Sequence, residues 1–96
     1  MSPQLWRVPR AADFLLRDWD ADGVLYDMAS GDTHRLGALH LELLDLLQQQ
    51  PRSLDDLLLS LAADLPEHLA PHEQQQLVAA GLAELAGLNL IEALAP

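Results

Sequence analysis

Residues 24 to 36 read Val-Leu-Tyr-Asp-Met-Ala-Ser-Gly-Asp-Thr-His-Arg-Leu, and residues 37 to 47 continue Gly-Ala-Leu-His-Leu-Glu-Leu-Leu-Asp-Leu-Leu. The pattern changes from the two-residue period of a strand to the spacing of a helix. Residues 24 to 28 alternate as a strand does, residues 30 to 32 supply turn chemistry, and residues 33 to 36 can pair back. The sequence therefore predicts a hairpin that leads straight into a helix. Its last strand is short and polar, and we expect it at a sheet edge, where unpaired backbone groups can accept another chain.

The rest of the 96-residue chain extends this plan in both directions. A strand at Phe14 to Trp19 and a turn at residues 20–23 precede the hairpin, which gives a three-stranded antiparallel meander. Helices are expected from about Ala38 to Gln49, after Ser53 as an N-cap with Asp56 three residues on, and from Pro71 to about Ala86. We expect Pro51 to stop the first helix, Gly87 to cap the last and Leu88 to Ile91 to pack back on the core. Leu5 to Val8 is a possible short strand.

The predicted fold class is therefore α+β and winged-helix-like, with a three-stranded antiparallel sheet (about 14–36) followed by three helices (about 38–86). We expect one domain over residues 1–96, since this length suits one small core.

Charge is divided unevenly along the chain. The formal net charge is −10, all five cations are arginines, and none lies beyond Arg52. Residues 53–96 carry seven carboxylates and no fixed cation, so this half repels nucleic acid and anionic lipid. The chain has no cysteine and no apolar run of bilayer length, and we expect a cytoplasmic protein without membrane partners.

Five groups of residues share a pattern with one known family: Val24 to Asp27, Ser30 to Leu36, Ala38 with Leu43-Leu44, Pro51 to Leu57, and Leu82 to Leu85 with Leu88 to Ile91. Together they resemble the PqqD-like family, the peptide chaperones or recognition elements of ribosomally made and modified peptides. A tryptophan near the start, the pair Trp19-Asp20 and the segment from Tyr26 to His34 resemble more closely the branch called the HPr-related-A system PqqD family. The resemblance covers roughly residues 6 to 92.

The resemblance implies a non-catalytic adaptor that holds the leader of a precursor peptide for a modifying enzyme. In that family the leader adds as a strand to the third strand of the sheet, in a groove beside the third helix. It implies no cofactor, metal or catalytic residue, and we expect a monomer or weak dimer. Carried onto this chain, the peptide-binding residues are Thr33, His34, Arg35, Leu36, Gln74, Gln75 and Val78.

Other interpretations stay open at this point. A structural or dimerisation subunit would use the leucine-rich third helix and tail as an interface. A DNA-binding winged helix would need cations on residues 71–86, which have none. An enzyme lacks support, because no nucleophilic, acid/base or phosphate-binding cluster is apparent.

Single residues also have two interpretations each. Residues 18–23 match half of a calcium loop, but Ala29 stands where a glutamate ligand is needed, which favours a hairpin turn. His68 and His72 have a metal-like spacing, but Pro71 lies between them and no third ligand is near, which favours a linker. Trp6 and Trp19 suit the core or peptide stacking, Arg35 suits peptide contact or protection of the edge, and His34 is either a pH-tuned contact or a polar strand residue.

Overall fold

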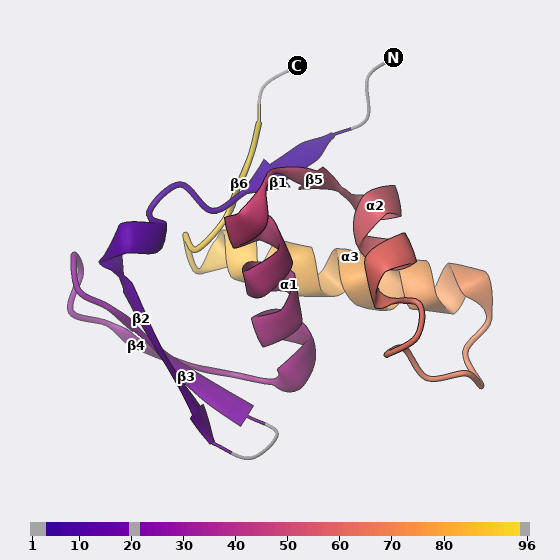
Figure 1. The fold of residues 1–96 in the computed structure, drawn as a ribbon, viewed down its shortest axis with the longest axis horizontal. Coiled ribbons are helices and arrows are strands. Elements are labelled where there is room, and N and C mark those ends of the chain that lie inside the picture. The colour runs from indigo at the N-terminus through magenta and orange to yellow at the C-terminus, as the bar shows by residue number, and fades with distance from the viewer. Residues whose placement is uncertain (1–3, 20–21, 95–96) are drawn as a thin grey trace.

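The computed structural model describes residues 4–19 and 22–94. Its described part contains two three-stranded antiparallel sheets and three α-helices, and the class is α+β as predicted. The larger sheet has the order β2-β3-β4, formed by Phe14–Trp19, Asp22–Asp27 and Thr33–Leu36. The expected meander is thus confirmed (Figure 1). The middle strand begins two residues before Val24 and ends one residue before Met28.

The turn expected at residues 20–23 falls partly outside the described residues, and Asp22 and Gly23 belong to β3. The next turn is described in full. Gly31 has a φ of 80° and donates its N–H to the carbonyl of Asp27 at 2.7 Å. Glycine takes this left-handed conformation without steric cost, so Gly31 allows β3 to reverse into β4.

The three helices are α1 (Ala38–Gln49), α2 (Leu54–Leu61) and α3 (Pro71–Gly87). The expected N-cap of α2 is confirmed, because the hydroxyl of Ser53 accepts the N–H of Asp56 at 3.2 Å. Pro71 occupies the first turn of α3, where its missing N–H would have no helical partner. Pro51 follows the end of α1, also as expected.

The C-terminal end of α3 differs from the expectation. Gly87 is not the cap: it is the last helical residue, and Leu88 is the C-cap. Asn89 takes a φ of 62° and donates its N–H to Ala86, while Leu90 donates to the carbonyl of Leu85 at 3.0 Å. This is a Schellman ending, in which asparagine takes the left-handed position usually held by glycine. It turns the chain so that Leu90 and Ile91 become buried, which confirms that the tail packs on the core.

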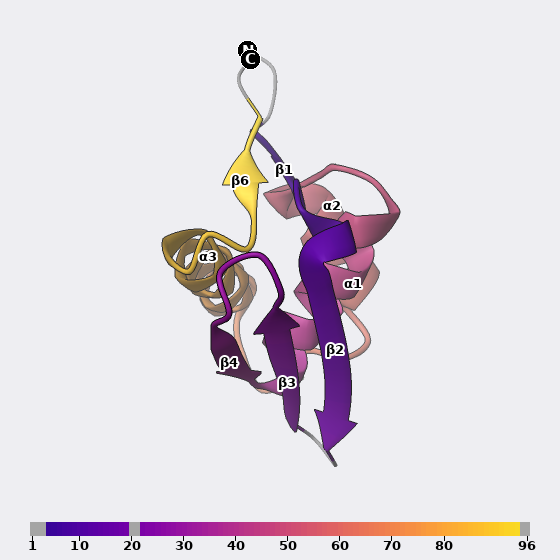
Figure 2. The same ribbon diagram turned by 90° about the vertical axis from the view of Figure 1, so that its left-hand side faces the viewer.

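The sequence predicted one strand of the second sheet, the possible short strand at Leu5 to Val8, but not the sheet itself. It has the order β5-β1-β6, with strands Arg52–Ser53, Leu5–Arg7 and Glu92–Ala93. It brings together the described parts near both ends of the chain and the start of α2, at the opposite end of the molecule from the end of β2 and the start of β3 (Figure 2). A 3-10 turn, Ala11–Asp13, connects β1 to β2.

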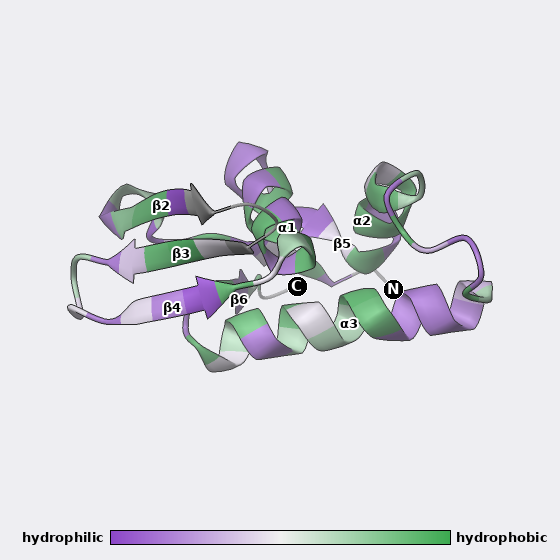
Figure 3. Ribbon diagram, turned by 90° about the horizontal axis from the view of Figure 1, so that it is seen from below, coloured by the Kyte–Doolittle hydropathy of each residue, from purple (hydrophilic) through white to green (hydrophobic). Residues whose placement is uncertain are grey.

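Leucines from all three helices make most of the core. Several core residues from β3 and the three helices have no exposed surface: Leu25, Leu43, Leu44, Leu57, Val78 and Leu85. Seen from below, α3 is hydrophilic at its N-terminal end and more apolar toward its middle (Figure 3). No helix in the described part of the chain is long and apolar enough to cross a membrane.

Candidate peptide-binding site

Strand β4 forms one edge of the larger sheet. It pairs only with β3 within that sheet, with Thr33 opposite Tyr26 and Leu36 opposite Gly23. Figures 2 and 3 both place β4 beside the C-terminal half of α3. The edge expected from the sequence is therefore present, and its neighbour is a helix rather than another strand.

The backbone N–H and C=O groups of β4 point alternately toward β3 and away from it. The register shows which residues point each way. Asp27 donates its N–H to the carbonyl of Asp32 at 2.8 Å, and this pair continues the register in which Leu25 faces His34. Because hydrogen-bonding direction alternates along an antiparallel strand, His34 and Leu36 bond to β3. The N–H and carbonyl groups of Thr33 and Arg35 point away from the sheet, toward any strand that is added.

The side chains of β4 alternate in the same way. Leu36 is buried at 4% exposure and His34 is half-buried, on the face that carries Leu25. Thr33 and Arg35 are exposed on the opposite face. The four residues predicted for this edge thus form one strand with an inner pair and an outer pair.

The three α3 residues named from the family pattern lie in the first half of the helix, whereas β4 lies beside the second half (Figure 3). Gln75 is exposed, and Gln74 donates from its side-chain amide to the carbonyl of Pro66 at 3.3 Å. Val78 has no exposed surface and packs in the core. Whether any of the seven residues binds peptide stays a prediction.

Two contacts hold α3 against the start of α1, next to the end of β4. The Nε2 atom of His40 lies 2.8 Å from a carboxylate oxygen of Glu84. Gly81 packs so close to α1 that a Cβ atom there would lie 3.0 Å from the side chain of Leu43. Sequence reasoning missed His40 and Glu84, because the pair is separated by 44 residues.

An ion pair links the sheet to the end of α3. The guanidinium of Arg10 donates to both carboxylate oxygens of Asp27, at 3.1 and 2.9 Å, and to the carbonyl of Asn89 at 3.0 Å. Asp27 is only 2% exposed, and it also accepts the backbone N–H groups of Ala29 and Ser30. The hydrogen bonds from Arg10 are the main reason that the pKa of Asp27 falls from 3.8 to about 2. Arg10 therefore fixes the β3–β4 turn relative to the end of α3.

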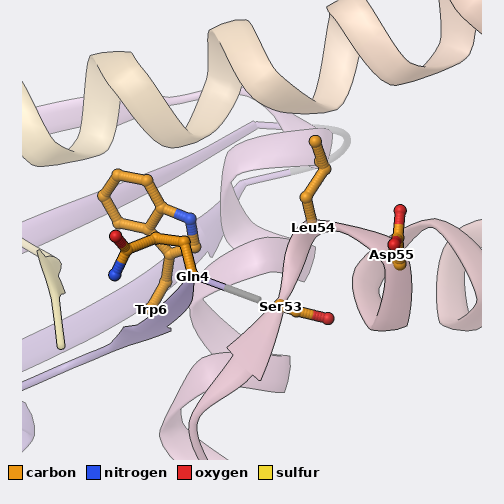
Figure 4. A pocket seen from close by; sticks show the side chains of 5 residues that line it. All are labelled: Gln4, Trp6, Ser53, Leu54 and Asp55. Carbon is orange, nitrogen blue, oxygen red and sulfur yellow. The ribbon is translucent and has the colours of Figure 1, made fainter. Parts of the chain in front are cut away.

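The half-buried Trp6 packs against the core and lines a hollow of about 360 Å³ with Gln4, Ser53, Leu54 and Asp55. Figure 4 shows the indole beside Gln4, with Leu54 nearby. This hollow lies by β1 and β5, whereas β4 lies at the other end of α1, a helix of 12 residues and about 18 Å. It is therefore separate from the β4 edge.

The remaining candidates lie apart from that edge. The half calcium loop is flanked by strands β2 and β3, as expected for a hairpin, although residues 20 and 21 lie outside the described residues. His68 lies in the exposed connection between α2 and α3, and His72 is exposed in the first turn of α3. Within residues 4–19 and 22–94 no group of three or more possible metal ligands is found. The leucines of α3 and the tail proposed for a dimer interface are mostly buried in the core, including Leu82, Leu85 and Leu90.

Comparison with known proteins finds one informative similarity of structure. The structure described as TbiB1 in complex with the TbiA(beta) leader peptide superposes with a TM-score of 0.70 and 17% sequence identity. The match covers 94% of this chain and 99% of that one. No family model matches the sequence. No curated protein matches it either. At this identity the similarity establishes the fold.

Proposed function

We propose that this chain is a non-catalytic, PqqD-like peptide-binding adaptor that takes the leader of a precursor peptide onto β4 and presents it to a modifying enzyme. The observation that carries the proposal is the edge itself. Thr33 and Arg35 direct their backbone groups away from β3, beside α3. An extended peptide can bond to such groups as an added strand. The fold supports the same proposal, because TbiB1 was solved with a leader peptide.

The binding residues in this proposal have different tasks. The backbone of Thr33 and Arg35 supplies hydrogen bonds, and the side chains of His34 and Leu36 shape the inner face beneath the peptide. Gln74 and Gln75 contact a longer peptide at the far end of α3, and Val78 supports that helix from the core. The negative charge of residues 53–96 favours a leader with basic side chains over an acidic one.

Amide hydrogen exchange measured by NMR tests this assignment. The probe is a precursor leader peptide, to be sought among short open reading frames near the gene and chosen by its binding to this protein. In the free protein the amide of Thr33 should exchange more quickly than that of His34, which is protected by its bond to β3. Saturating peptide should slow exchange at Thr33 and Arg35 and leave that of His34 nearly unchanged. A peptide that binds without protecting these two amides would show that strand addition at β4 is incorrect.

The adaptor role has a separate test. The peptide should keep its mass when incubated with this protein alone, and the enzyme that modifies the precursor should act on it faster when this protein is present. The Arg35→Pro variant described below is the control for that second measurement. Modification that is equally fast with and without the adaptor would contradict the presentation role.

A further inference from the structure

A second cavity lies where α1, α2 and α3 meet, and neither the sequence motifs nor the proposed strand addition makes use of it. Its volume is about 470 Å³, within the range of small-ligand pockets. Four leucines and two carboxylates make most of the lining: Leu39, Leu61, Leu65, Leu77, Glu42 and Asp64. Leu61 and Leu65 are buried, and the other two leucines are more exposed.

The charged residues that line this pocket are both acidic. Glu42 and Asp64 are both exposed, and no cation is among the lining residues. Neither carboxylate has a side-chain hydrogen bond or ion pair with any part of the chain that the structure describes. An apolar hollow flanked by unpaired carboxylates complements an apolar side chain that has a cation beside it.

The pocket begins close to the proposed peptide edge in the chain. Ala38, which also lines it, follows the last residue of β4 by two positions. On α3, Leu77 and Glu84 are seven residues apart and therefore lie on the same side of the helix, with Glu84 held by His40. Seven residues of helix span about 10 Å, which equals about three residues of extended peptide. A peptide on β4 that runs on past Leu36 thus reaches the pocket within a few residues.

We propose that this pocket binds an aliphatic or aromatic side chain of the bound peptide, next to a lysine or arginine. The anchor side chain lies about three residues beyond the segment that pairs with β4, on the side of Leu36. The identity of the occupant as a peptide rests on the proposed function. The chemistry of the pocket does not, and it can be tested without a leader.

The test uses two small probes, N-acetyl-leucyl-arginine amide and N-acetyl-leucyl-glutamate amide, titrated into the isotope-labelled whole protein at low salt. The arginine probe should shift the NMR signals of Leu39, Glu42 and Leu77 and leave those of Thr33 and Arg35 unchanged. The glutamate probe should bind at least about fivefold more weakly, because it meets two carboxylates instead of complementing them. Equal binding of both probes, or shifts spread evenly over the surface, would overturn the proposal.

Matched variants distinguish binding in the pocket from non-specific binding to exposed apolar side chains. Leu77→Ala should weaken the arginine probe about fivefold, since it removes apolar contact. Leu88→Ala is the control, because Leu88 is 41% exposed, close to the 39% of Leu77, but does not line the pocket. Glu42→Gln with Asp64→Asn should abolish the preference for arginine, whereas Asp45→Asn on the exposed side of α1 should retain it. If Leu77→Ala and Leu88→Ala weaken binding equally, the pocket is not the site.

The register is tested with random peptides displayed on phage and selected on the whole protein. Selected peptides should share an extended segment and an apolar-basic pair about three residues outside it. Selection on Leu77→Ala should keep the segment and lose the pair. Peptides with the segment alone would overturn the pocket and keep strand addition, whereas peptides with the pair alone would keep the pocket and count against strand addition. Selection of neither feature would contradict both.

Discussion

The carboxylate of Asp27, at the end of β3, and the guanidinium of Arg10 form a two-armed ion pair with distances of 2.9 and 3.1 Å. Arg10 also lies over the ring of Phe14, 5.2 Å from its centroid, and reaches the carbonyl of Asn89 beyond α3. One side chain therefore connects β2, the β3–β4 turn and the end of α3. The β3–β4 turn and the end of α3 lie on either side of the proposed peptide site, so the pair fixes their spacing.

The acid sensitivity of the fold should depend on Asp27. Its pKa is about 2 in the folded protein against an ordinary 3.8, so the folded state favours the ionised form. The resulting stabilisation is complete above about pH 4 and is lost as the pH falls through 3.8 toward 2. Asp27→Asn should be less stable than the wild type at neutral pH, and the difference should shrink over that window. Thermal melting of both proteins from pH 7 to 2 measures it, and a constant difference would contradict the pKa assignment.

Loss of Arg10 should destabilise the protein more than loss of Arg7. Arg7 pairs with Glu92, and both side chains are nearly half exposed, so Arg7→Ala should cost about 0.2–1 kcal/mol of unfolding free energy. Arg10→Ala leaves the nearly buried Asp27 without its partner, which is the more costly situation. Urea denaturation of the two variants provides the comparison. Equal losses would mean that Arg10 acts as an ordinary surface residue.

The backbone conformation at the end of α3 predicts opposite effects of alanine on stability at positions 87 and 89. Gly87 is helical with open space around its Cβ position, so Gly87→Ala should stabilise the protein by about 0.5–1 kcal/mol. Asn89 has a positive φ, so Asn89→Ala should be about 1 kcal/mol less stable than Asn89→Gly. Thermal or urea unfolding tests both. If Gly87→Ala were destabilising, Gly87 would be the left-handed cap that the sequence pattern suggested.

The N-cap of α2 should be worth a measurable part of the stability. Ser53→Ala removes the acceptor for the N–H of Asp56 and should cost about 1 kcal/mol. Ser60→Ala, at an exposed helical position without a capping bond, is the matched control and should change stability little. A similar loss in both variants would show that the hydroxyl of Ser53 does not act as a cap.

Local signals account for what the sequence predicted correctly. The meander, the three helices and the cap at Ser53 depend on periodicity and on turn or capping residues within a few positions. In the β5-β1-β6 sheet only β1 was indicated, as a possible strand at Leu5 to Val8. The other two strands have two residues each, too few to show a period. Arg10 and Asp27 are 17 residues apart, and only the tertiary fold brings them together. The end of α3 was placed one residue early because glycine is the usual left-handed residue and asparagine the less common one.

Only the part of the candidate site that is continuous in the chain could be predicted. A short polar strand at the end of a hairpin indicates a sheet edge, and β4 has the predicted bounds. Which part of α3 faces that edge depends on how the helix crosses the sheet, and no residue pattern within α3 records this. The predicted glutamines therefore lie toward the far end of the helix from β4. The pocket at Leu77 was equally hidden, since three helices contribute to it.

The sharpest test of strand addition uses proline at adjacent positions of β4, because the register now separates their roles. The N–H of Arg35 points outward, so Arg35→Pro should leave the sheet paired while it removes a donor to the peptide. The N–H of His34 belongs to the ladder with β3, so His34→Pro should lower the melting temperature by several degrees. Arg35→Ala is the control for the side chain, whose own interactions are lost in both Arg35 variants. Thermal melting should show that Arg35→Pro is folded. Titration with the same leader peptide should show that it binds at least about tenfold more weakly than Arg35→Ala. Equal peptide affinity of Arg35→Pro and Arg35→Ala would mean that the peptide does not pair with this edge, and attention would move to the pocket beside Leu77.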